Sequence, residues 1–136
     1  MEYFDVIIEH LNTQKELKIV IDVDEAEESE LIVLHTILNR EEIVSSDPCY
    51  FTSFQNFRDY LLKLGYGMKC KGAYVNAVQL PMMCICDRIY LVSMGKQALM
   101  KDAVGMFEYA DIHEFCSSKE QIEYFVSWCE SIMPKE

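Results

Sequence analysis

A stretch punctuated by glycines is the strongest constraint on how this chain can fold. Four of its five glycines lie between Gly65 and Lys101, together with three of its six cysteines. Glycine is favoured where the backbone needs a positive φ or a close approach to another segment. We therefore expect shaped turns between short strands, and the apolar runs place those strands at 66–71, 74–78 and 88–94. The residues of this stretch do not by themselves indicate a chemistry.

The N-terminal residues predict a β-hairpin. Apolar residues alternate with polar ones over 3–11 and again over 17–23, and a polar segment at 12–16 separates the two runs. Alternation with a period of two is typical of strands that bury one face. Two such runs joined by a short polar segment predict antiparallel neighbours.

The next run, residues 25–38, fits two different elements. Asp24 would cap a helix with an acidic first turn, and Leu31, Leu34 and Leu38 would then share one face. A buried strand through 31–34 fits nearly as well, because a short apolar run does not separate the two cases. We favour the helix.

Two later stretches carry helix start and stop signals. In the first, Thr52 and Gln55 would form a capping box, and Gly65 stands where a helix commonly ends. In the second, Ser118 opens a capping box and Pro134 ends the helix. The apolar face predicted for this second helix consists of Ile122, Phe125, Cys129 and Ile132, widened by Val126 and Met133.

Together these elements predict one α+β domain over residues 1–136. It would contain a mixed or mostly antiparallel sheet, the N-terminal β-hairpin and two to three helices, and the run 103–109 is a further candidate strand. A chain of this length can bury a core without disulfides. No apolar run is long enough for a membrane span, and the N-terminus is acidic where a signal peptide is basic. We expect a cytoplasmic protein with reduced thiols and no membrane partner.

Charge indicates the kind of partner. The chain has 23 acidic and 12 basic residues and a net charge of −11, although the middle of the chain is basic. Nucleic-acid binding needs a basic face and is therefore disfavoured. An acidic surface attracts a basic protein partner, although solubility is the commoner reason for such a charge. The densest acidic cluster comprises Asp22, Asp24, Glu25, Glu27, Glu28 and Glu30.

The cysteines suggest an alternative chemistry. Cys84 and Cys86 form a C-x-C sequence preceded by two methionines, and soft ligands of this kind suit copper(I) or zinc. Structural zinc sites, however, need a second pair of ligands, and none accompanies this one. Cys116 lies three residues after His113, which we interpret as a capping loop with an incidental histidine. We expect no cofactor, and we keep a metal-binding or cysteine-dependent enzyme domain as the alternative.

Several motifs occur in a distinctive order: GYGMKCKGAYVNAV at 65–78, Pro-Met-Met at 81–83, IYLVSMGKQA at 89–98, KDAVGMFEY at 101–109 and SKEQIEYFVSW at 118–128. This order resembles small bacterial immunity proteins encoded beside Rhs-type and related polymorphic toxins. The resemblance runs from about residue 54 to 128. One departure is that Cys-Ile-Cys follows Pro-Met-Met where a glycine-bearing turn is expected. The family has no catalytic residues.

The resemblance implies a non-enzymatic protein that blocks a cognate toxin by occlusion. An acidic face would match a basic active cleft, as in a nuclease. We expect the acidic cluster to be the contact surface, with Tyr74, Met82 and Met83 as the second choice. A small-molecule site in the glycine-rich turns, lined by Tyr66, Tyr74 and Met82, is a further alternative.

Overall fold

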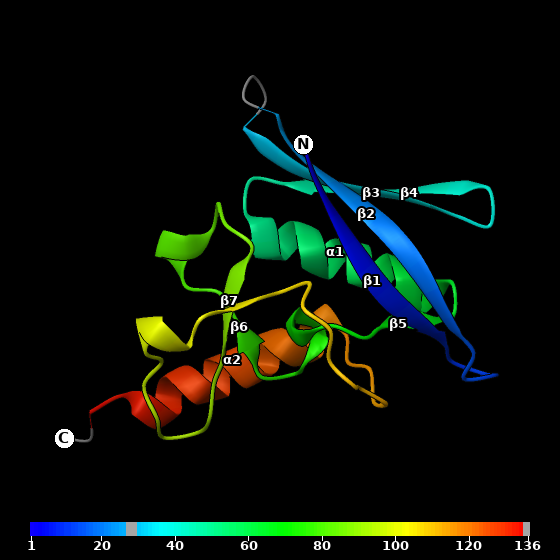
Figure 1. Cartoon of the computed structure of the whole chain (residues 1–136). Helices are drawn as coiled ribbons and strands as arrows, with labels where there is room; N and C mark the ends of the chain where they lie inside the picture. The colour runs from blue at the N-terminus through cyan, green and yellow to red at the C-terminus, as the bar shows by residue number, and fades with distance from the viewer. Residues whose placement is uncertain (27–29, 135–136) are drawn as a thin grey trace.

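The computed structural model describes residues 1–26 and 30–134, and the fold is α+β as predicted (Figure 1). A five-stranded sheet has the order β4-β3-β2-β1-β5, and all its neighbouring strands are antiparallel. A smaller sheet has the order β6-β7-β8. The strands of the large sheet are β1 (Glu2–His10), β2 (Glu16–Ala26), β3 (Leu31–Leu38), β4 (Glu41–Asp47) and β5 (Tyr66–Met68).

The N-terminal β-hairpin is confirmed. Strands β1 and β2 pair in antiparallel register from Glu2 opposite Val23 to Glu9 opposite Glu16. Along β1 the side chains of Val6 and Ile8 are buried, whereas Asp5 is exposed and Ile7 is half-buried, which is the alternation seen in the sequence.

The helix predicted over residues 25–38 is wrong where the structure describes this run. Residues 31–38 form strand β3, and Asp24 caps no helix but lies in β2 opposite Val33. Strand β3 pairs on both sides, with β2 and β4, and these two ladders satisfy its backbone in place of helical hydrogen bonds. A two-residue turn with positive φ at Asn39 and Arg40 joins β3 to β4, which is the geometry that matches strand twist.

Helix α1 (Tyr50–Lys63) packs on one face of the large sheet through Phe54, Phe57 and Leu61, all fully buried. The chain leaves the helix at Gly65, whose φ of 93° confirms the predicted glycine stop. The predicted Thr52–Gln55 capping box is wrong, because the helix begins earlier, with Cys49 at its N-cap and no side-chain cap. Gln55 is instead buried and bonded to another helix.

The glycine-rich stretch contains strands shorter than the sequence predicts. β5 ends at Met68, and β6 (Ala77–Val78), β7 (Arg88–Leu91) and β8 (Val104–Gly105) form the small sheet. The chain turns between them in short 3₁₀ helices at Lys71–Ala73, Pro81–Met83 and Met100–Asp102. Gly72 is needed for close approach, because a Cβ there would lie 2.9 Å from Met106 Cβ and Phe54 Cζ.

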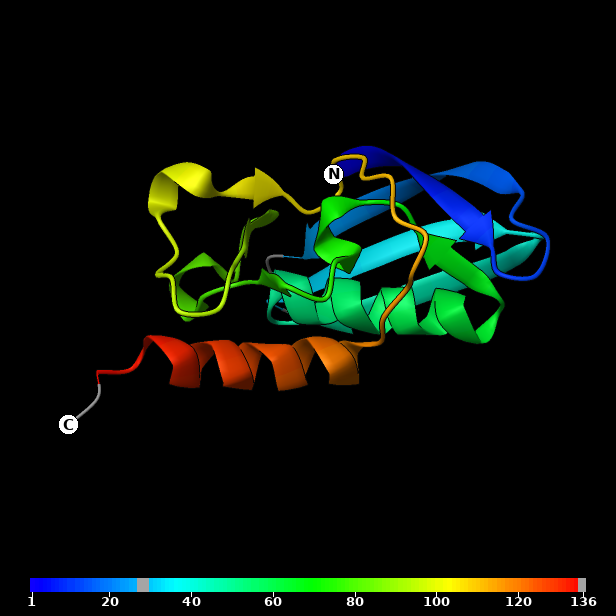
Figure 2. The ribbon, with the colours of Figure 1, turned by 90° about the horizontal axis from the view of Figure 1, so that it is seen from below.

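Helix α2 (Ser118–Ile132) lies alongside α1, on the side away from the large sheet (Figure 2). Its capping box joins Ser117 and Glu120, one residue earlier than predicted. Trp128 is buried with Val78, Tyr90 and Val92 in a second apolar cluster. None of the helices within the described residues is long and apolar enough to cross a membrane.

The buried face of α2 is rotated from the predicted one. Gln121 and Trp128 are its buried residues, and Phe125, Cys129 and Ile132 are half-buried as part of the same cluster. Ile122 and Val126 are exposed, although the sequence placed both on the apolar face. The centre of the face therefore includes a buried amide that hydrophobic spacing does not reveal.

Candidate functional site

The large sheet has one face packed on α1 and one open face. Tyr3, Val20, Ile37 and Val44 point outward on that open face and are between 49% and 67% exposed. They alternate with the side chains that pack against α1, one from each of the strands β1 to β4. Exposed apolar side chains gathered on one face are typical of an interaction surface.

Acidic side chains are interleaved with these apolar residues on the open face, and Asp22 and His35 lie between Tyr3 and Val44 across the strands. Its carboxylates are Asp5, Asp22, Asp24 and Glu42, and the cations beside them are Lys18 and His35. The Lys18 Nζ lies 3.3 Å from Asp5 Oδ2 in an exposed pair. The open face therefore has more negative than positive charge.

His35 connects three strands across the open face. Its Nδ1 lies 2.9 Å from Asp22 Oδ2 on β2, and its Nε2 lies 3.1 Å from Glu42 Oε1 on β4. The hydrogen bond to Asp22 raises the pKa of His35; partial burial opposes this, and Glu42 adds to the rise. The arrangement favours the imidazolium, since both ring nitrogens face carboxylates.

A hollow of about 530 Å³ opens where β2 and β3 separate. The ladder between these strands runs from Ala26–Leu31 to Asp22–His35, and beyond it Thr36 Oγ1 donates to Val20 O at 2.7 Å. Figure 1 shows the β3–β4 hairpin crossing the β1–β2 hairpin at a wide angle. Tyr3 and Ile37 line this hollow, with Asp22 and His35 at the paired end, so it can receive a side chain that has an apolar stem and a basic tip.

The predicted acidic cluster is only partly assembled. Asp22 and Asp24 share the open face, Glu25 is the next residue of β2 and points to the other side, and exposed Glu30 precedes β3 with a φ of 55°. Glu27 and Glu28 lie outside the described residues. Sequence reasoning did not predict the exposed apolar side chains of this face. Apolar residues at outward positions of both N-terminal strands could have indicated them.

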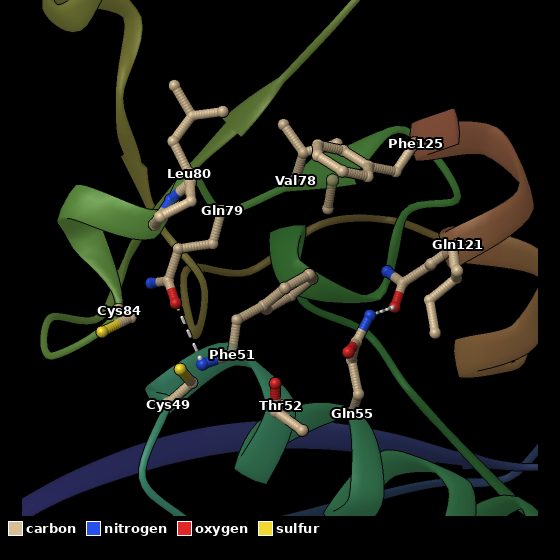
Figure 3. Close-up of a pocket in the computed structure, with 13 residues that line it drawn as sticks. Cys49, Phe51, Thr52, Gln55, Val78, Gln79, Leu80, Cys84, Gln121 and Phe125 are labelled. Carbon is tan, nitrogen blue, oxygen red and sulfur yellow. Dashed lines mark hydrogen bonds between the residues drawn. The ribbon is translucent and has the colours of Figure 1, made fainter. Parts of the chain in front are cut away.

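A second hollow is an apolar groove of about 310 Å³ between the N-terminal end of α1, the β6–Pro81 segment and α2 (Figure 3). Gln55 Nε2 donates to Gln121 Oε1 at 3.0 Å across it. Its apolar walls consist of Phe51, Ala77, Val78, Leu80, Pro81, Ile122 and Phe125.

Tyr74, Met82 and Met83 do not form one surface. Met82 is exposed, Met83 packs against the second apolar cluster, and Tyr74 lines a different hollow beside Cys116. Tyr66 packs edge-on against His10. None of these three hollows is lined by Tyr66, Tyr74 and Met82 together.

Cys84 and Cys86 have different surroundings. The Cys86 thiol donates to Met83 O at 3.2 Å, whereas Cys84 lies at the apolar groove beside Cys49. In the part of the chain that is described, no three His, Cys, Asp or Glu side chains are grouped so as to hold a metal ion. The C-x-C sequence therefore does not present its two thiols to a common point.

His113 and Cys116 do not pair either. The Cys116 thiol donates to Ala73 O at 3.3 Å, while the His113 ring lies 3.2 Å from Asp111 and 3.8 Å from Glu9. Burial raises the pKa of Cys116, although nearby Arg58 opposes the rise. A buried thiol with a raised pKa is a poor nucleophile.

Lys69 holds a buried ion-pair cluster at the β5 edge. Its side chain is 3% exposed, and its Nζ lies 3.1 Å from Glu16 and Asp111 and 3.8 Å from Glu9. Burial alone would lower the pKa of Lys69, but hydrogen bonds to Asp111 and Glu16 more than offset this and raise it. Because the cluster joins β1, β2 and β5 to the segment before α2, its role is structural.

Comparison with known proteins adds no family to this geometry. Neither a scan against models of protein families nor a search of curated proteins gave a significant match.

Proposed function

We propose that this chain is a non-enzymatic protein-binding domain that captures a basic protein on its open face, as an immunity protein captures its toxin. The observation that carries the proposal is that exposed Tyr3, Val20, Ile37 and Val44 share one face of the sheet with interleaved carboxylates. The resemblance to immunity proteins of polymorphic toxins supports the same function.

The two kinds of side chain would act differently in binding. The exposed apolar side chains would supply most of the affinity, because desolvated aromatic and aliphatic anchors dominate interface energies. The carboxylates between and beside them, including Asp22 and Asp24, would accelerate encounter with a basic surface and orient it. A partner Lys or Arg entering the hollow beside Tyr3 would reach Asp22.

Inhibition would follow from occlusion. A broad, strand-built surface laid over a basic cleft blocks access of an anionic substrate without any chemistry by this chain. A nuclease is the partner class with the most basic cleft, because its substrate is a polyanion.

The test uses the product of the neighbouring gene, which the proposal expects to be a toxin. Co-expression should restore growth, and the purified pair should form a complex measurable by calorimetry. Ile37→Arg on the open face should weaken binding by about 100-fold, or roughly 2–3 kcal/mol. Ile122→Arg on α2 is the matched control, because both isoleucines are exposed and the two lie on different elements.

Salt provides a second readout. If the carboxylates of the open face steer the partner, the association rate should fall as ionic strength rises, while the dissociation rate changes little. Failure of the wild-type chain to restore growth, or equal binding by Ile37→Arg and wild type, would refute the proposal.

A further inference from the structure

Cys49 and Cys84 are far apart in sequence but adjacent in the fold. Cys49 is the N-cap of α1, and Cys84 follows the 3₁₀ turn Pro81–Met83. The Tyr50 amide donates to the carbonyl of Cys84 at 2.6 Å, so the backbones at the two cysteines are in direct contact. Because the amide belongs to the residue next to Cys49 and the carbonyl to Cys84 itself, the two cysteines are neighbours, as a disulfide requires.

Gln79 reinforces the same contact from its side chain. Its Oε1 accepts from the Phe51 amide at 3.1 Å, and its Nε2 donates to Cys86 O at 2.7 Å. The Gln79 side chain is therefore hydrogen-bonded both to the first turn of α1 and to the loop that carries Cys84. The relative position of the two segments is fixed by three hydrogen bonds.

The two thiols lie side by side at the mouth of the apolar groove (Figure 3). Both residues are half-buried, so small reagents can reach them. The other four cysteines are placed differently: Cys70 and Cys116 are buried, the Cys86 thiol is hydrogen-bonded to Met83 O, and Cys129 packs against the second apolar cluster on α2. The geometry favours one specific pairing among the six cysteines.

We propose that Cys49 and Cys84 form a redox-responsive dithiol that a peroxide or a small-molecule disulfide converts into an intramolecular disulfide. With hydrogen peroxide, one thiol loses its proton, its thiolate attacks the peroxide and becomes a sulfenic acid, and the hydroxide that leaves takes up a proton to become water. The second thiol then displaces water from that sulfenic acid and forms the S–S bond. In total the two thiols lose two electrons and two protons, and the peroxide is reduced to two molecules of water.

The surroundings of Cys49 set the pace of this reaction. Burial, the neighbouring Cys84 thiol and Asp47 at the end of β4 raise the pKa of Cys49, whereas its place at the N-terminus of α1 favours the thiolate. The thiolate is the reactive form, so oxidation is slow at neutral pH and accelerates as the pH rises. The site therefore responds to sustained oxidant.

The disulfide would fasten the start of α1 to the Pro81–Cys84 loop across one side of the groove. It would close a long chain loop, from Cys49 to Cys84, and such cross-links stabilise mainly by restricting the unfolded chain. We expect the oxidised protein to melt several degrees higher than the reduced protein, and reduction with dithiothreitol to reverse the shift.

The test treats the native, reduced chain with hydrogen peroxide and, in parallel, with oxidised glutathione. Thiol titration after denaturation should show that two of the six cysteines are consumed in a monomer. Non-reducing tryptic mapping should link the peptides 41–58 and 72–88. Because the second peptide also contains Cys86, the Cys86→Ser variant should keep the link, and Cys49→Ser and Cys84→Ser should lose it.

Controls separate specific pairing from misfolding. Cys129→Ser alters another half-buried thiol and should leave the link unchanged, and thermal melts of each reduced variant show whether it is folded. A link that involves Cys86, one that joins two molecules, or one that forms only in urea would overturn the proposal. So would a native chain that keeps all its thiols under both oxidants.

Discussion

Replacing Gln121 with leucine tests what joins the two helices. The buried Gln121 amide uses both of its ends: Oε1 accepts from Gln55 Nε2 at 3.0 Å and from Arg58 Nη2 at 2.6 Å. Its Nε2 donates to the carbonyls of Gly72 and Tyr74, both at 2.8 Å. One side chain of α2 is thus bonded to α1 and to the glycine-rich turn.

The loss of unfolding free energy in Gln121→Leu can be estimated from the buried groups that lose a hydrogen bond. Arg58 is 1% exposed, and its Nη1 already has no hydrogen-bond partner among the described residues, so losing the Nη2 partner leaves this buried cation bonded only through Nε, to Asp59 Oδ1 at 3.1 Å. Gly72 O also loses its bond, whereas Tyr74 O keeps one from the Ala77 amide at 3.1 Å. At about 2–3 kcal/mol for the charged group and about 1–2 kcal/mol for the carbonyl, less about 1 kcal/mol for the apolar leucine, we expect a loss of about 3 kcal/mol.

Urea unfolding followed by tryptophan fluorescence measures this loss, because Trp128 is the only tryptophan and lies buried on α2. In a chain of this size, such a loss lowers the melting temperature by roughly 10 °C. Glu123→Leu, an exposed change on the same helix, should stay within about 0.5 kcal/mol of wild type. A Gln121→Leu variant as stable as Glu123→Leu would refute the view that this amide carries the helix contact.

Two further outcomes follow from single side chains. The raised pKa of His35 means that its contribution to stability is complete below the unfolded value of about 6.5 and is lost as the pH rises through the folded value. The gap in unfolding free energy between wild type and His35→Gln should therefore narrow from about pH 6 to about pH 9 in a urea series, and a constant gap would contradict the assignment. Ser117→Ala should cost about 1 kcal/mol through the lost cap of α2, whereas Thr52→Ala should cost less than about 0.5 kcal/mol in the same assay, since Thr52 caps nothing.

The elements that the sequence predicts correctly are those marked by patterns of neighbouring residues. The N-terminal hairpin follows from the alternation of apolar and polar residues. The end of α1 follows from Gly65, because glycine readily adopts the positive φ found there. The capping box of α2 was predicted one residue too late, because Ser117 and Ser118 are adjacent and both satisfy the pattern. Ser118 instead bonds its hydroxyl and amide to Asp59 of α1, a tertiary contact.

Residues 31–38 show where local reasoning fails. Their apolar spacing fits both periods, and the choice is made by β2 and β4, which supply backbone partners on both sides. The Asn39-Arg40 turn was the missed local signal, since asparagine tolerates a positive φ better than most residues do. A turn recognised there would have favoured a β3–β4 hairpin over a helix.

The candidate sites depend on contacts that no local pattern contains. Which face of the large sheet stays open is decided by where α1 packs, and the pairing of the strands puts Tyr3 and Ile37 on that same face. The C-x-C sequence drew attention to Cys86, yet the thiol beside Cys84 belongs to Cys49, on a different element. Sequence spacing can reveal groups of ligands that lie close together in the chain. It could not reveal this pair, because folding brings the two cysteines together from different elements.

The two proposed sites lie on opposite sides of α1, which makes them separable. The open face is the outer surface of the sheet, and the apolar groove begins at the first turn of α1 on the side toward α2. Phe54 and Phe57 anchor α1 to the sheet and are fully buried, so a bond at Cys49 restrains a helix end that is already fixed. We therefore expect the Pro81–Cys84 loop to take up most of the adjustment when the bond forms. A partner whose affinity changed on oxidation would have to contact the groove, whereas a partner bound only by the open face would not distinguish the two redox states.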